Sequence, residues 1–186
     1  GELGIVRQRV GALQALAAEF DAGRISLDRA APLAATLDAL RALPGIGEPF
    51  AAAVRDVCEF LDGAGLRPPA GRVEGRVCYD DPCHLVHGQG VRDAPRRLLA
   101  QIPGVTLVPH DDPTSCCGAA GIYNITHRAM SRAVLARKLK ALAAAHPDWI
   151  ASGNPGCLMQ LRSGAEASGL RARIVHPIEL LDLSYS

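Results

Sequence analysis

From residue 72 onward the 186-residue chain alternates short apolar runs with longer amphipathic stretches. The apolar runs predict strands, and the amphipathic stretches predict helices. The strands are expected at 76–80, 105–109, 149–152 and 172–175, and the helices at 91–102, 118–145, 155–168 and 177–183. Such alternation implies a parallel sheet covered by helices and joined by right-handed crossovers. We therefore expect an α/β fold whose parallel sheet has about four strands.

The amino-terminal part reads differently and is expected to be helical. Apolar residues recur there at intervals of three or four, with a third helix predicted over 48–61. Cys58 falls beside the apolar stripe of that helix, which favours a buried structural thiol. Pro68 to Gly71 read as a linker. The chain is thus expected to divide into a helical segment, residues 1–67, and an α/β domain, residues 72–186.

Composition and charge exclude several classes of protein. A net charge of +1 gives no argument for a nucleic-acid partner. No apolar run reaches the roughly 18 residues of a membrane span, and Gly1 to Gly4 have none of the features of a signal peptide. Six cysteines could form disulfides, but an apolar core and no secretory signal favour free thiols in a reducing compartment. We expect a cytoplasmic location. Partner proteins could in addition hold the chain at the inner face of the membrane.

Four of the six cysteines follow predicted strands. Cys83 follows the first strand, Cys116 and Cys117 follow the second, and Cys157 follows the third. Parallel strands end at one edge of their sheet, where ligands of open α/β sheets bind. We therefore expect the four thiols to meet, whereas Cys78 lies within a strand and is expected in the core.

The predicted amino-terminal ends of two helices favour a metal site at this edge of the sheet. Asn154 and Pro155 predict the beginning of a helix, so Cys157 would lie in its first turn, and Cys117 is expected to precede or open another helix. The positive end of a helix dipole stabilises thiolate over thiol. Thiolates from several segments are the ligands of zinc and of iron–sulfur clusters, and Gly118 and Gly121 would let such a group approach the backbone.

Three motifs together resemble the cysteine-rich CCG domain family. They are Asp81-Pro82-Cys83-His84, Cys116-Cys117-Gly118-Ala119-Ala120-Gly121 and Asn154-Pro155-Gly156-Cys157. The resemblance runs from about residue 50 to the end, and is strongest to the carboxy-terminal part of the iron–sulfur subunit of glycolate oxidase. It implies an iron–sulfur electron-transfer module of an oxidoreductase complex that oxidises a 2-hydroxy acid, with Cys83, Cys116, Cys117 and Cys157 as metal ligands.

The resemblance also has a departure. The family pattern ends in Cys-x-x-Cys, and here Gln160 takes the place of the final cysteine. The four remaining cysteines could hold a [4Fe–4S] cluster or a zinc ion, or form a site without metal. The family's ferredoxin-like segment and first CCG domain are also absent from the sequence, so we expect a fragment of an electron-transfer subunit. Its implied partner is a flavoprotein subunit, and no catalytic residue is assigned to the chain itself.

Two alternative functions stay open from the sequence. One is an interaction domain whose cysteines bind zinc or no metal, and the other is a thiol/disulfide redox module like heterodisulfide reductase. His84 and His87 follow the first cysteine and are candidates to ligate or contact the cofactor, and His176, at the end of the fourth predicted strand, has the same weight. His110 and the acidic residues after it are interpreted as a turn. The basic residues Arg128, Arg132, Arg137 and Lys138 are expected on a solvent-exposed helix face or a docking surface.

Overall fold

A computed structural model of the chain describes residues 18, 21–22, 54–121 and 123–186. The chain divides into two compact units, residues 1–55 and 56–186. The helices predicted before residue 48 lie outside the described residues. The expected division of the chain into a helical segment and an α/β domain at residues 67 to 72 stays a prediction. In the second unit, helix α4 (Val57–Ala64) begins later than expected, where the Asp56 side chain accepts hydrogen bonds from two backbone N–H groups.

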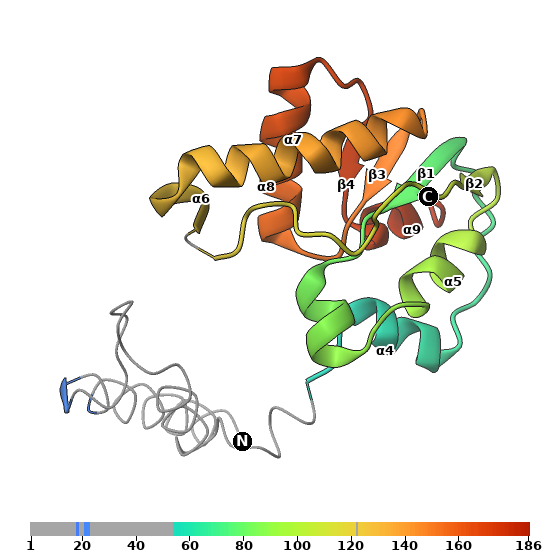
Figure 1. The fold of residues 1–186 in the computed structure, drawn as a ribbon. Coiled ribbons are helices and arrows are strands. Elements are labelled where there is room, and N and C mark those ends of the chain that lie inside the picture. The colour runs from blue at the N-terminus through green and yellow to red at the C-terminus, as the bar shows by residue number, and fades with distance from the viewer. Residues whose placement is uncertain (1–17, 19–20, 23–53, 122) are drawn as a thin grey trace. The chain divides into compact units, whose positions relative to one another are not determined.

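The second unit is built on a four-stranded parallel sheet, which confirms the predicted fold class (Figure 1). The strands are β1 (Gly75–Tyr79), β2 (Val105–Leu107), β3 (Trp149–Ala151) and β4 (Arg173–Val175), in the order β2-β1-β3-β4. All three pairings are parallel, with Val77 opposite Leu107 on one side and opposite Trp149 on the other. Each strand lies within two residues of its predicted bounds.

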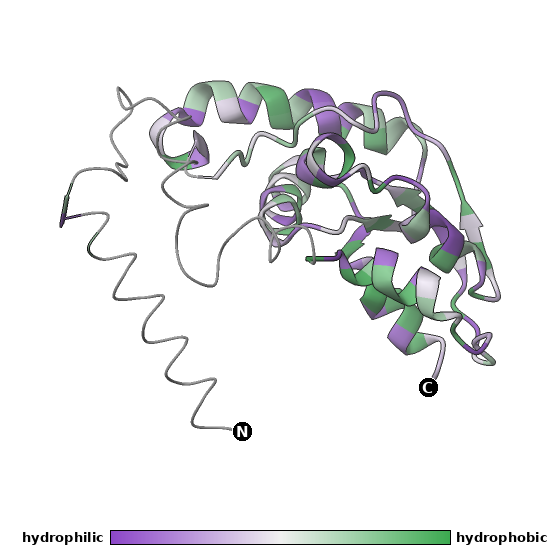
Figure 2. Ribbon diagram, turned by 90° about the horizontal axis from the view of Figure 1, so that it is seen from below, coloured by the Kyte–Doolittle hydropathy of each residue, from purple (hydrophilic) through white to green (hydrophobic). Residues whose placement is uncertain are grey.

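Helices cover both faces of this sheet. Helices α7 (Arg128–Ala144) and α8 (Pro155–Ser168) pack on one face, and α5 (Ala94–Ala100) and α9 (Pro177–Leu183) on the other. Strand β1 shows the alternation that separates the two cores, since Cys78 faces α7 and α8 while Val77 and Tyr79 face α5 and α9. The flanking helices carry both hydrophobic and hydrophilic residues, coloured green and purple in Figure 2.

Two short elements were not predicted. A π-helix, η1 (His84–Gln89), follows Cys83, and the expected helix over 118–145 is divided into α6 (Tyr123–Thr126) and α7. Gly118, Ala120 and Gly121 all have positive φ angles, which no α-helix accommodates. The segment after the cysteine pair is therefore a turn.

The strand order defines a particular point at the carboxyl edge of the sheet. From β1 the chain moves outward to β2, and from β3 it moves outward in the opposite direction to β4. Neighbouring strands whose connections diverge in this way leave a crevice beyond their carboxyl ends. None of the described helices is long and apolar enough to cross a membrane.

Candidate metal centre

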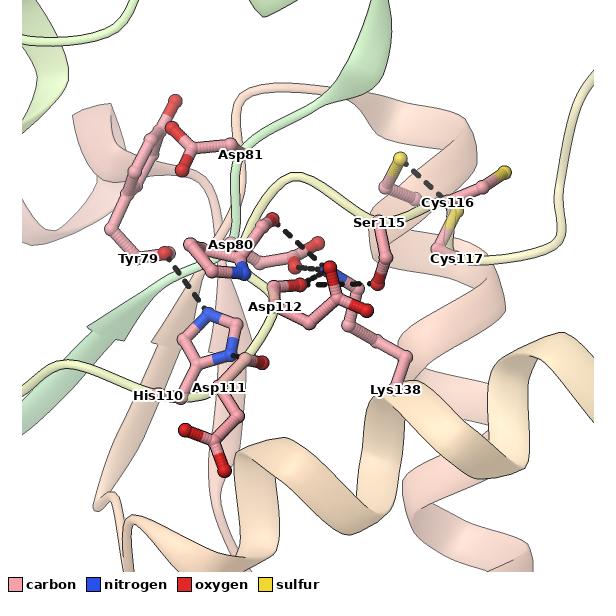
Figure 3. Close-up of polar contacts among 12 residues, drawn as sticks. Tyr79, Asp80, Asp81, His110, Asp111, Asp112, Ser115, Cys116, Cys117 and Lys138 are labelled. Carbon is pink, nitrogen blue, oxygen red and sulfur yellow. Dashed lines mark hydrogen bonds and ion pairs between the residues drawn. The ribbon is translucent and has the colours of Figure 1, made fainter.

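The crevice between the ends of β1 and β3 is where the structure brings cysteines together. Cys83 follows β1 and Cys157 lies in the first turn of α8, directly after β3. The loop after β2 brings Cys116 and Cys117 to the same edge (Figure 3). The Cys117 and Cys157 sulfur atoms lie 3.1 Å apart. Cys83 lies close enough to raise the pKa of both Cys116 and Cys157, although burial and the bond to Cys117, respectively, are the larger causes.

The four thiols differ in exposure. Cys117 and Cys157 are buried, Cys116 is half-buried, and Cys83 is exposed. The site therefore has a dry side, formed by the buried pair, and a side open to solvent.

A hydrogen bond joins the sulfur atoms of the buried pair. The hydrogen bond between Cys117 and Cys157 is the main influence that lowers the pKa of Cys117. A hydrogen bond from the backbone N–H of Ala119 lowers this pKa further. The same pairing, followed by burial, raises the pKa of Cys157. Cys117 is therefore the better thiolate of the two, because a second donor stabilises its negative charge.

Among the residues that the structure describes, no three His, Cys, Asp or Glu side chains are arranged to hold one metal ion. The four-cysteine ligand set therefore stays a prediction. The donor chemistry fits the group, since thiolates select zinc and iron–sulfur clusters over hard cations. Backbone N–H groups also surround the sulfurs, as where Gly118 donates to the Cys116 Sγ over 3.3 Å.

Helix α8 begins as predicted and orients Cys157. The Asn154 side chain accepts a hydrogen bond from the Cys157 N–H at 3.1 Å, and Pro155 occupies the first turn. The Asn154 amide also donates to His84 Nδ1 at 3.0 Å, which ties the loop after β1 to the start of α8. Cys117 has no such helix, because α6 begins six residues later, at Tyr123.

Three other histidines are either exposed or hydrogen-bonded to backbone groups. His87 is exposed on η1. His176 begins α9, where its Nδ1 accepts the Ile178 N–H and Glu179 completes a capping box. His110 lies within hydrogen-bonding distance of the Tyr79 backbone oxygen.

The two glycines proposed to admit a cofactor have different surroundings. At Gly118, with φ +88°, an added Cβ would lie 2.5 Å from the Ser131 backbone oxygen. At Gly121, with φ +62°, an added Cβ would meet nothing within 4 Å. Close approach of α7 explains Gly118, while the role of both glycines toward a cofactor stays a prediction.

A buried ion pair lies beneath the cysteine loop, at a residue whose predicted exposure was wrong. Lys138 was expected on a solvent-exposed face, but its side chain is 1% exposed and its Nζ lies 2.6 Å from Asp80 Oδ1 (Figure 3). The Nζ also donates to the backbone oxygens of Asp112 and Pro113, at 3.1 and 3.0 Å. Arg128, Arg132 and Arg137 are exposed, as predicted.

Burial dominates the ionisation of Asp80. Loss of water raises the pKa of its carboxyl group, and the charge of Lys138 opposes that rise. The next carboxylate, Asp81, makes a two-pronged pair with Arg96 at 2.7 and 2.6 Å. Both acids that precede Cys83 are therefore matched by a cation.

The sequence did contain a sign of these buried polar residues. The buried positions of α7 are Ser131, Leu135, Lys138, Leu139 and Leu142. Their spacing of three, four and one follows one helix face, so Ser131 and Lys138 occupy positions on the apolar stripe. Position, rather than residue type, would have assigned them to the interior.

Comparison with known proteins confirms the resemblance. Residues 77–162 match the family described as "Cysteine-rich domain", CCG. The chain is 41% identical over 107 residues to a probable glycolate oxidase iron–sulfur subunit of Bacillus subtilis, covering 56% of this chain and 24% of the relative. It is 32% identical over 127 residues to the glycolate oxidase iron–sulfur subunit of Escherichia coli, covering 68% and 30%.

A third relative bears a different name. The chain is 32% identical over 138 residues to one of the subunits of the fumarate reductase (CoM/CoB) of Methanothermobacter marburgensis, covering 72% of this chain and 27% of the relative. The chain thus spans roughly a quarter to a third of the length of these three relatives.

Proposed function

Since residues 77–162 match the cysteine-rich CCG domain, we propose that the chain is an iron–sulfur electron-transfer module of a 2-hydroxy-acid-oxidising complex. The observation that carries the proposal is the 3.1 Å distance between the Cys117 and Cys157 sulfur atoms at the edge of the sheet where the loops after β1 and β2 also place Cys83 and Cys116. The names of two relatives supply iron–sulfur as the cofactor and glycolate as the model substrate.

In this proposal Cys83, Cys116, Cys117 and Cys157 ligate a [4Fe–4S] cluster, which takes up and releases single electrons when bound. The remaining chemistry belongs to the chain. Cys117 and Cys157 close the inner side of the site against water, because both are buried. The exposed Cys83 leaves the outer side open toward a partner.

The proposed partner is a flavoprotein subunit, on which the hydroxy acid would be oxidised. Large apolar side chains border the cysteine edge, where a partner could bury them: Ile125 on α6 is 71% exposed and Met159 on α8 is 72% exposed. Exposed apolar groups beside a functional site favour protein contact. Association with a membrane would then occur through the partner.

The experiment is anaerobic production of the full chain, followed by iron, sulfide and zinc analysis and visible spectroscopy. We expect about four iron and four sulfide per chain and a brown colour. Cys157→Ala should abolish both, whereas Cys78→Ala, at an equally buried thiol within β1, should retain them.

Two results would overturn the proposal. A colourless protein with one zinc per chain would instead favour the zinc-stabilised interaction domain. A cluster that survives Cys157→Ala would refute the four-cysteine ligand set.

A further inference from the structure

A chain of two hydrogen bonds joins helices α8 and α7 to the turn after the cysteine pair. The Gln160 Nε2 donates to the Ser131 Oγ at 2.9 Å, and the Ser131 Oγ donates to the Gly118 backbone oxygen at 2.8 Å. A serine hydroxyl has one proton, so donation to Gly118 leaves its lone pairs to accept from Gln160. Both hydrogen bonds therefore run in the same direction, from Gln160 through Ser131 to Gly118.

This chain closes a ring around the buried thiols. Gln160 lies three residues after Cys157, which places both on neighbouring positions of one helix face. Gly118 directly follows Cys117, whose sulfur lies 3.1 Å from that of Cys157. The spacing of the two sulfurs is thus determined by the helix on one side and by the hydrogen bonds on the other.

The ring has little freedom to relax. Ser131 is 1% exposed, and Gly118 approaches its backbone so closely that no side chain would fit. A second anchor lies two turns along α7, where Lys138 binds the backbone oxygens of Asp112 and Pro113. Helix α7 therefore holds the cysteine loop on both sides of the Cys116–Cys117 pair.

We propose that Gln160 is a positioning residue, which acts through Ser131 and Gly118 to hold the Cys117 thiol against Cys157 before any metal binds. This role concerns the protein without cofactor, so it can be tested separately from the proposed electron transfer. It assigns a function to the residue that replaces a cysteine of the family pattern.

The test measures thiol reactivity in the full, reduced, metal-free chain. Gln160→Met keeps the length of the side chain and removes its donor, and Ser131→Ala removes the link to Gly118. Iodoacetamide labelling, followed by peptide mass spectrometry, gives a rate for each cysteine. Hydrogen exchange of the peptide that contains Gly118 gives an independent reading of the same loop.

We expect labelling of Cys117 and Cys157 to accelerate about tenfold in both variants, as the loss of one buried hydrogen bond predicts. Labelling of Cys58 and Cys78, each 0% exposed, should keep its wild-type rate. Gln101→Met, at an exposed glutamine, is the matched control and should change nothing.

Two outcomes would overturn the proposal. Unchanged labelling and exchange in Gln160→Met would show that the hydrogen bonds do not hold the thiol. Equal acceleration at all four buried cysteines would show that Gln160 contributes only to overall stability.

Discussion

The buried Lys138–Asp80 pair gives the most direct prediction about stability. Lys138→Met removes a cation from a site that is 1% exposed and leaves Asp80, 2% exposed, without its partner. Methionine nearly preserves the volume of the side chain, so the change is mainly one of charge and hydrogen bonding. The Asp112 and Pro113 carbonyl groups lose a donor at the same time.

Breaking a buried ion pair from one side costs about 3–5 kcal/mol, because an unpaired charge stays in the interior. A domain of this size is stable by roughly 5–15 kcal/mol. The Lys138→Met variant should therefore lose a large share of its free energy of unfolding at pH 7 and yet remain folded.

Lowering the pH should return part of that loss. Burial already raises the pKa of Asp80, and removal of Lys138 removes an influence that lowers it. In the variant the folded-state pKa lies further above the unfolded value of about 3.9. The folded state then binds more protons than the unfolded state between these two values, so stability falls as the pH rises through that window. The variant should gain stability relative to wild type when the pH is lowered from 7 to 5.

Urea denaturation followed by circular dichroism, at pH 7 and at pH 5, measures both effects. Lys140→Met, at an exposed lysine of the same helix, should change the free energy of unfolding by no more than about 0.5 kcal/mol. Adding Asp80→Leu to Lys138→Met should recover most of the loss, since it removes the unpaired charge. A loss below about 1 kcal/mol for Lys138→Met, or an equal loss at both pH values, would refute the assignment of a buried, charge-stabilising pair.

Three further predictions concern glycines and a core thiol. Gly118→Ala should lower the free energy of unfolding, measured by urea denaturation, by about 3 kcal/mol or more, because φ is +88° and the added Cβ would lie 2.5 Å from a backbone oxygen of α7. Gly121→Ala, at φ +62° with open space around it, should lower it by only about 1 kcal/mol. Gly164→Ala would place a Cβ 2.7 Å from two leucine side chains of α7 and should destabilise by about 1–3 kcal/mol, whereas Gly63→Ala in α4 has open space and should stabilise by about 0.5–1 kcal/mol; equal effects would contradict the packing argument. Burial raises the pKa of Cys58 to about 12, so this thiol should resist Ellman's reagent at pH 8 until the protein unfolds.

The placement of the cysteine loops at one edge of the sheet could be predicted because it depends on few facts. Parallel strands and a loop after each were enough to place Cys83, the adjacent pair and Cys157 at one edge. The order of the strands was not needed for that step and could not be read from the sequence. The order nevertheless matters, since it places the crevice between β1 and β3 rather than elsewhere on the edge.

The turn after the cysteine pair could not be predicted from apolar periodicity. Its residues, Gly118 to Gly121, are small and compatible with a helix, but three of them have positive φ angles. The conformation follows from tertiary contacts, chiefly the approach of Ser131 to Gly118. The local sequence cannot predict such a contact, because Ser131 and Gly118 lie on different structural elements.

Charge balance links the fold to the proposed centre. Asp80 and Asp81 immediately precede the first cysteine loop, and carboxylates there oppose the formation of thiolates; Asp80 raises the pKa of both Cys117 and Cys157. Each carboxylate is paired, Asp80 with Lys138 of α7 and Asp81 with Arg96 of α5. Helices from the two faces of the sheet thus place a cation beside each carboxylate at the end of β1. An anionic thiolate-ligated group is therefore better accommodated at this edge than its acidic sequence suggests.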